Sequence, residues 1–267
     1  MPYASNDGVR LAYEREGPPD AETVLFVEGL GYGRWMWRFQ HRAVSDDYES
    51  IRWDNRGTGD SDEPEGPYTV SEMASDLEAV LDDAGVESAH VVGASMGGMI
   101  AQQYALEYDR ARSLTLMCTS PGGPEEVPIP DETLERMFGV PDDADEREAI
   151  RYKMRPALTE GFWADNEELI DRIVEWRLDS DASEQARNWQ AAGVDAFDVH
   201  DRLEEITQPT LLLHGTADRV VPYENGELLA AGLPDVEFVT LEGAPHLLFI
   251  ERHERVTDHL LEFLDDV

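Results

Sequence analysis

The sequence predicts an α/β fold in which a mostly parallel central sheet is flanked by helices and carries an inserted helical cap. Three observations lead to this prediction. Short apolar runs of strand length alternate with amphipathic helical patterns. The alternation stops at Pro121 and resumes only at Pro209. The 267 residues are 41% hydrophobic, which is enough to fill one large core.

The first part of the chain contains the patterns of five strands and two helices. Residues 9–13 alternate as an early antiparallel strand does. Further strands are expected, in order, at residues 24–27, 50–54, 90–93 and 113–117. Thr69 and Glu72 form a capping box, which starts an amphipathic helix. A second helix is expected over residues 97–108.

The middle of the chain differs from both flanks, because it is acidic, punctuated by proline and rich in helix-favouring residues. Strand patterns return at residues 210–214 and 237–241, and an amphipathic helix over residues 250–264 closes the chain. We therefore predict a core of residues 1–121 and 209–267 and a helical cap of residues 122–208.

The chain is strongly acidic, with 21 Lys and Arg residues against 58 Asp and Glu residues and a net charge of −37. Nucleic acids and anionic membranes attract basic proteins, so both are excluded as partners and a small-molecule substrate is expected. The acids are dispersed and Lys153 is the only lysine, a composition that resembles halophilic proteins. In such proteins, high salt screens the repulsion between the acids. Homo-oligomerisation is left open.

Signals for export, membrane insertion and metal binding are missing from the sequence. No apolar run reaches about 18 residues, and the N-terminus lacks the basic and apolar segments of a signal peptide. Cys118 is the only cysteine, which excludes an internal disulfide and a zinc site built from several cysteines. We expect a cytoplasmic protein without a metal or a cofactor.

A candidate nucleophile lies in the run from Gly93 to Gly98, which reads G-A-S-M-G-G between a buried strand and a helix. In that context the G-x-S-x-G pattern indicates a tight turn that presents the serine at the end of the sheet. Glycines permit the turn, and the N-terminus of the helix lies behind the serine. Ser95 is therefore the expected nucleophile.

A serine hydroxyl needs a base to remove its proton and a carboxylate to orient that base. For this kind of turn the expected chain order is serine, then acid, then histidine. Asp218 follows the strand at residues 210–214, and His246 lies in a Gly/Pro loop before the last helix. We predict that Ser95, His246 and Asp218 form a catalytic triad.

Negative charge that develops on a carbonyl oxygen needs preorganised N–H donors. The N–H of Met96 lies next to the nucleophile, and the glycine-rich loop after residues 24–27 offers the N–H of Leu30. We predict that these two donors form the oxyanion hole. The glycines of this loop also suggest a dinucleotide fingerprint, but Arg34 stands where that pattern needs glycine.

Five segments together resemble the α/β-hydrolase family over nearly the whole chain. They are Gly29-Leu30-Gly31, the run from Asp54 to Ser61, the run from Gly93 to Gly98, the run from Asp218 to Pro222, and the run from Gly243 to His246. The resemblance implies the parallel sheet, the helical cap over the site and the Ser95-His246-Asp218 triad. One position departs from the pattern, because many relatives have His-Gly where this chain has Glu28-Gly29. We expect Glu28 to be protonated, turned away or paired with a base such as Arg56.

The expected reaction is hydrolysis of a small or medium, largely apolar ester or lactone through an acyl-enzyme. A serine nucleophile argues against the dehalogenase and epoxide-hydrolase branches of the family, which use aspartate. Carbon–carbon bond hydrolases and cofactor-free perhydrolases or haloperoxidases share the triad and stay open. A ligand-binding member without catalysis is a further alternative, which Glu28 favours.

Aromatic residues near the oxyanion loop and in the cap suggest a mostly apolar pocket. The candidates for lining it are Glu28, Trp35, Trp37, Trp163 and Trp189. The alternative for the tryptophans is that they pack the cap against the core.

Overall fold

The computed structural model describes residues 1–141 and 143–267, and within them it confirms the α/β class. The strands form one sheet in the order β1-β2-β4-β3-β5-β6-β7-β8. Their bounds are β1 Tyr3–Asn6, β2 Val9–Glu16, β3 Thr23–Val27, β4 Glu49–Trp53, β5 Ala89–Ala94, β6 Ala111–Met117, β7 Thr210–Gly215 and β8 Val236–Leu241. The pairs β1–β2 and β2–β4 are antiparallel, and the pairs from β4 to β8 along this order are parallel.

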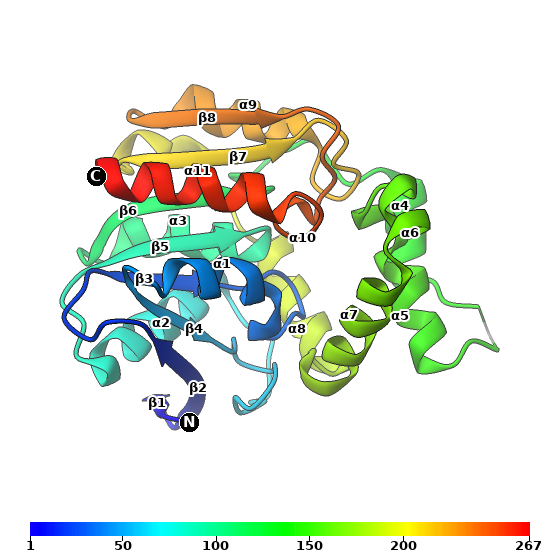
Figure 1. Cartoon of the computed structure of the whole chain (residues 1–267), viewed down its shortest axis with the longest axis horizontal. Helices are drawn as coiled ribbons and strands as arrows, with labels where there is room; N and C mark the ends of the chain where they lie inside the picture. Colours follow the sequence, from blue (N-terminus) through cyan, green and yellow to red (C-terminus); the bar gives the residue numbers. More distant parts are fainter. Residues whose placement is uncertain (142) are drawn as a thin grey trace.

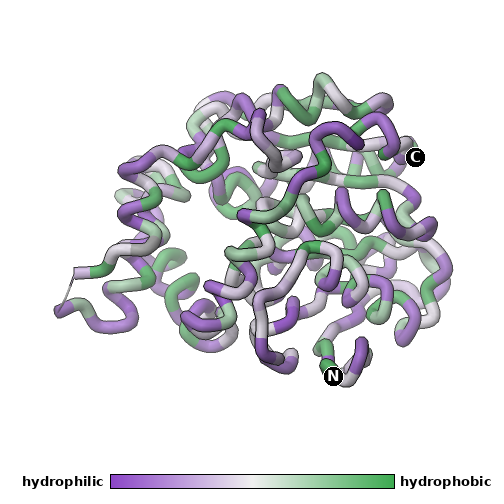
Figure 2. The backbone as a smooth tube through the Cα atoms, turned by 180° about the vertical axis from the view of Figure 1, so that it is seen from behind, coloured by the Kyte–Doolittle hydropathy of each residue, from purple (hydrophilic) through white to green (hydrophobic). Residues whose placement is uncertain are grey.

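Helices cover both faces of the sheet because its central strands are apolar on both sides (Figure 1). Leu25 and Val91 belong to the core cluster under α2 (Val70–Ala84) and α3 (Met96–Glu107). Their neighbours Phe26 and Val92 belong to the cluster under α1 (Arg38–Val44) and α11 (His253–Asp266). Figure 2 shows the hydrophobic residues gathered in the strands between these helices.

The chain between β6 and β7 forms a group of helices beside the sheet, at the end where β5 and β7 finish (Figure 1). The helices are α4 Asp131–Phe138, α5 Glu146–Met154, η2 Arg155–Ala157, α6 Glu160–Asp165, α7 Glu167–Ser180 and α8 Glu184–Asp195. The last helix before β7, η3 His200–Glu205, packs instead against the end of α9 (Tyr223–Gly232). Because parallel strands present functional loops at their carboxyl ends, this group lies next to the edge where a site is expected.

Several elements differ from those expected from the sequence. The strand β1, the helices η1 (Arg34–Trp37) and α1, and α9 (Tyr223–Gly232) were not expected. The predicted closing helix is divided into α10 (Leu248–Glu251) and α11, because Arg252 departs from helical dihedral angles. The capping box of Thr69 and Glu72 is confirmed at the start of α2. No described helix is both long and apolar enough to cross a bilayer.

Candidate active site

Ser95 occupies a sharp turn between β5 and α3, with φ 55° and ψ −123°. This left-handed φ is rare for a residue with a side chain. The turn is tight because Gly93 and Gly97 lack a Cβ atom. A Cβ on Gly93 would lie 2.2 Å from the Gly97 carbonyl oxygen, and a Cβ on Gly97 would lie 2.1 Å from the Val27 carbonyl oxygen. The expected strand–turn–helix geometry is therefore present at Ser95.

The structure brings Asp218, after β7, together with His246, in the loop after β8. The Nδ1 atom of His246 lies 2.8 Å from Oδ2 of Asp218. The other carboxylate oxygen accepts hydrogen bonds from the N–H groups of Val220, at 2.8 Å, and Val221, at 2.9 Å. Since Asp218 is an acceptor here, Nδ1 of His246 holds the proton and Nε2 is free to accept one.

Asp218 is buried, yet its surroundings keep it ionised. Burial alone would raise its pKa, but the charge of His246 and the hydrogen bonds from His214 and His246 lower the pKa to about 2. His214 is fully buried and its Nε2 lies 3.0 Å from the carbonyl oxygen of Val221. Asp218 is therefore held as a carboxylate by two histidines and two backbone donors.

Ser95 and His246 line one cavity of about 130 Å³. Leu30 and Met96, the two expected oxyanion donors, line the same cavity. Within residues 1–141 and 143–267, neither backbone N–H has a hydrogen-bond acceptor. A Cβ on Gly29 would lie 3.5 Å from the Cβ of Ser95, so the loop after β3 packs directly against the nucleophile turn. Two unsatisfied donors therefore lie beside Ser95.

Glu28 does not line this cavity, which corrects its assignment as a pocket residue. Its side chain is fully buried and neither carboxyl oxygen has a hydrogen-bond partner in the described chain. Burial, and then the charge of Asp54, raise the pKa of Glu28 well above its ordinary value. Burial without a partner favours the protonated, neutral form of a carboxyl. That form places no full charge near the oxyanion donors.

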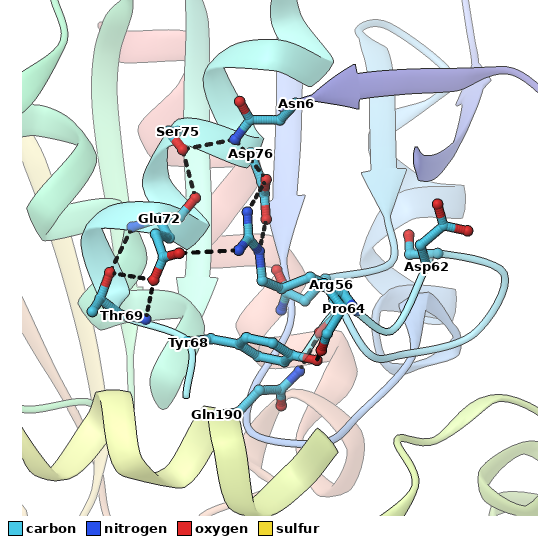
Figure 3. A network of polar contacts seen from close by, with 12 residues as sticks. Asn6, Arg56, Asp62, Pro64, Tyr68, Thr69, Glu72, Ser75, Asp76 and Gln190 are labelled. Atoms are coloured by element: carbon cyan, nitrogen blue, oxygen red, sulfur yellow. Dashed lines mark hydrogen bonds and ion pairs between the residues drawn. The ribbon is translucent and has the colours of Figure 1, made fainter. Parts of the chain in front are cut away.

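Arg56 is committed elsewhere, so of the three alternatives expected for Glu28 the pairing with Arg56 is excluded. Its guanidinium binds Asp76 through two hydrogen bonds of 2.6 and 2.8 Å, and Glu72 lies 3.4 Å away (Figure 3). Both acids are on α2, so Arg56 ties the loop after β4 to that helix. Gln190 of α8 joins the same network by donating to the Arg56 carbonyl oxygen at 2.9 Å (Figure 3).

The four tryptophans predicted to line the pocket do not line it either. They contact other parts of the protein instead. The indole N–H of Trp35 donates to Asp181 at 2.8 Å, and Trp189 packs on Tyr68. Trp37 packs on Phe26 and Phe249, and the guanidinium of Arg155 lies over the ring of Trp163. Trp35 and Trp189 join the core to the 122–208 segment. The large apolar surface of these rings is therefore used in packing, which is the alternative the sequence left open.

Sequence reasoning missed three basic residues of the cavity lining: Lys153 on α5, Arg177 on α7 and Arg187 on α8. Arg177 is buried, pairs with Asp181 at 2.6 Å and lies 4.5 Å above the ring of Tyr32. One feature of the sequence could have indicated this group of cations: Lys153 is the only lysine of an acidic chain.

One group of side chains could in principle offer metal ligands at the site. Ligand atoms of Cys118, Asp218 and His246 lie within 4.8 Å of one another, and all three residues are buried. Burial raises the pKa of the Cys118 thiol well above its ordinary value, so it is not a thiolate. The 2.8 Å contact between His246 and Asp218 is a hydrogen-bond distance. We assign these atoms to a histidine–carboxylate pair.

A sequence model of the alpha/beta hydrolase fold matches residues 22–253. The chain therefore belongs to the α/β-hydrolase family.

Relatives with assigned names are hydrolases. A putative carbamate hydrolase RutD of Azorhizobium caulinodans is 32% identical and covers 100% of this chain and 99% of its own length. A 2-hydroxy-6-oxononadienedioate/2-hydroxy-6-oxononatrienedioate hydrolase of Paraburkholderia phymatum is 33% identical over 96% of this chain and 91% of its own. The crystal structure of the enol-lactonase from Burkholderia xenovorans has a TM-score of 0.84 at 27% identity, over 99% of this chain and all of that one. These relatives support hydrolytic activity for this protein.

Proposed function

We propose that the protein is a serine hydrolase that cleaves a carboxylic ester or lactone through an acyl-enzyme on Ser95. One observation carries the proposal: Ser95 lines the same cavity as His246, whose Nδ1 is hydrogen-bonded to the ionised Asp218. A nucleophile, a base and an acid that orients the base are the parts that acyl transfer requires.

The mechanism follows from these atoms. Nε2 of His246 removes the Ser95 proton as Oγ attacks the carbonyl carbon, and the N–H groups of Leu30 and Met96 stabilise the oxyanion. The imidazolium, stabilised by Asp218, then gives that proton to the leaving alkoxide. Water repeats the sequence on the acyl-enzyme: it gives a proton to His246, its oxygen bonds to the acyl carbon, and the acid leaves as Ser95 recovers the proton.

Residues 122–208 act as a cap in this proposal. Support comes from the cavity lining, because α5, α7 and α8 contribute side chains to it together with Ala157 of η2. The Thr159 N–H also donates to Glu251 of α10 at 2.9 Å, which attaches the segment to the core beside the site. Substrate bound at Ser95 would therefore be enclosed from the side that faces away from the sheet.

Carbon–carbon bond hydrolysis is the second candidate, because the relative from Paraburkholderia phymatum is named as a hydrolase of an oxononadienedioate. The same triad serves both reactions, and they differ in the bond broken after attack. A ligand-binding role without catalysis has less support, since the neutral, buried Glu28 removes the feature that favoured it.

The test uses p-nitrophenyl esters of increasing acyl length with purified protein in molar KCl. Ser95→Ala should lower kcat/KM by about a thousand-fold or more, as loss of a triad nucleophile does. Ser71→Ala, at an exposed serine on α2, is the matched control and should retain activity. If the folded wild type hydrolyses no ester and no lactone, the proposal of an ester or lactone hydrolase is overturned. Release of a dienoic acid from a vinylogous diketone would then favour carbon–carbon bond hydrolysis.

A further inference from the structure

Three cationic side chains face the cavity that contains Ser95. Lys153, Arg177 and Arg187 come from three different helices of the 122–208 segment and line the same space. The chain has 58 acidic residues against 21 basic ones, and its single lysine is one of the three. A group of cations is therefore placed in one cavity of a molecule that is otherwise dominated by negative charge.

Two of these cations lack an acidic partner within residues 1–141 and 143–267. Arg177 forms its ion pair with Asp181, and Arg187 donates only to the carbonyl oxygen of Met137, at 3.3 Å. Lys153 forms no hydrogen bond or ion pair among the described residues. Burial lowers the pKa of both Lys153 and Arg187. Repulsion lowers it further, chiefly from Arg187 on Lys153 and from Arg177 on Arg187, and the attraction of Glu184 offsets only part of this. Half-buried cations that repel one another are unfavourable unless an anion joins them.

The acidic groups near the cavity do not neutralise this charge. Among the described residues, Glu126 is the one acid that lines the space, where it accepts a hydrogen bond from the Ser120 hydroxyl. Outside the lining, Asp181 is committed to Arg177 and to the indole N–H of Trp35, and the exposed Glu184 of α8 attracts Lys153 and Arg187 without forming an ion pair with either. The cavity wall therefore carries three cations against one acid.

The cations lie close to the loop that presents the Leu30 N–H. A Cβ on Gly31 would lie 3.0 Å from Cδ of Arg187, so the Arg187 side chain crosses this loop directly. Tyr32, the next residue, lies under the Arg177 guanidinium at 4.5 Å. A ligand whose carbonyl reaches Ser95 would therefore have its other end within the same small cavity as the cations.

We propose that the substrate carries a carboxylate at a distance from its scissile acyl group, and that Lys153 and Arg187 bind this carboxylate. The inference rests on the proposed function, because it names the substrate class of the same site. Arg177 adds positive charge, while its pair with Asp181 keeps it in place. Guanidinium and ammonium groups bind carboxylates by charge-assisted hydrogen bonds, which are stronger in a partly desolvated site.

The test compares two substrates of the same shape, mono(4-nitrophenyl) adipate and 4-nitrophenyl adipamate, which differ only in a carboxylate against a carboxamide. Release of 4-nitrophenolate is corrected for the reaction without enzyme. The wild type should prefer the adipate in kcat/KM, chiefly through KM. Lys153→Met and Arg187→Met should each lower the preference by about ten-fold. Lys153→Arg, which retains the charge, should restore most of it.

Arg151→Gln is the matched control. It removes one positive charge from the same helix as Lys153, but Arg151 does not line the cavity and pairs with Asp171 outside it. This variant should leave the preference unchanged. An equal preference of wild type for the two esters, or an equal loss in Arg151→Gln, would overturn the proposal.

Binding to Ser95→Ala separates this inference from the proposed function. Calorimetry should show that adipate binds and adipamide does not, and that adding Lys153→Met removes adipate binding. If no ester is hydrolysed but this pattern holds, the carboxylate site stands and the hydrolase proposal fails. If esters are hydrolysed through Ser95 without preference and adipate does not bind, the carboxylate site fails and the hydrolase proposal stands.

Discussion

Asp218 orients His246 through a 2.8 Å hydrogen bond to Nδ1 while its second oxygen is held by two backbone N–H groups. The carboxylate is therefore anchored to its own loop, independently of the histidine. Since the loop with His246 follows a different strand, this contact also joins the loop after β7 to the loop after β8. The pair combines a chemical role with a structural one, and the two can be separated experimentally.

Asp218→Asn should reduce kcat by about 10⁴-fold with little change in KM, because the amide stabilises the wrong tautomer of His246. Hydrolysis of a p-nitrophenyl ester by the variant and by wild type provides the comparison. A loss of less than about ten-fold would contradict a role for Asp218 as the acid of the triad.

The same pair predicts a pH dependence of folding. The folded pKa of Asp218 is about 2 against an ordinary value of 3.8. This lowered pKa contributes stability that is present above pH 3.8 and is lost as the pH falls through about 2. The contribution is about 2 kcal/mol. Urea unfolding of wild type and Asp218→Asn at matched pH isolates it, because titration of the surface acids is common to both. If the difference in unfolding free energy between wild type and Asp218→Asn stays constant on acidification, the lowered pKa of Asp218 is contradicted.

Replacing Ser95 by glycine should give a more stable protein than replacing it by alanine, by about 1 to 2 kcal/mol. Both variants lack the hydroxyl, so they differ in backbone freedom. At φ 55° and ψ −123° glycine relieves the strain that a Cβ atom imposes. Denaturant midpoints measure the difference. At Ser71, in the exposed face of α2, the order should reverse, with alanine more stable than glycine by about 1 kcal/mol.

Glu28→Gln should stabilise the protein increasingly as the pH rises. The folded pKa of Glu28 is raised well above 4.5, so the folded chain retains a proton that the unfolded chain releases. The associated stability is complete below pH 4.5 and is lost as the pH rises toward the folded pKa. Glutamine has the shape of the neutral acid and does not titrate. Its advantage should grow by about 1.4 kcal/mol per pH unit across that window.

Chemical unfolding of wild type and Glu28→Gln over a series of pH values measures this slope. Glu135→Gln, at an exposed position on α4, is the control and should show no such trend. A wild type that becomes more stable than Glu28→Gln at high pH would mean that the carboxylate is ionised and satisfied.

The parts of the site that could be predicted from the sequence are those set by local geometry. The glycines around Ser95 impose their turn within six residues, and Asp218 directly follows a strand whose pattern is plain. The strands of the sheet could also be predicted from local sequence, because a buried parallel strand is a continuous apolar run.

The parts that escaped prediction depend on contacts between distant segments. Lys153 and Arg187 reach the cavity only because α5 and α8 pack beside the sheet, and no short pattern records that packing. The tryptophans were assigned to the pocket from their size, whereas Trp35 uses its N–H to hold Asp181 some 146 positions away in the chain. Helix α1 lacks a regular apolar period in its short length and was missed.

The place of the single lysine has a practical consequence for handling the protein. Apart from the N-terminal amine, Lys153 is the only primary amine of the sequence, and it lines the cavity beside Ser95. Amine-reactive dyes and coupling resins would therefore attach inside this space and obstruct it. Conversely, one fluorophore on Lys153 would report directly on what enters the cavity, with no background from other side-chain amines.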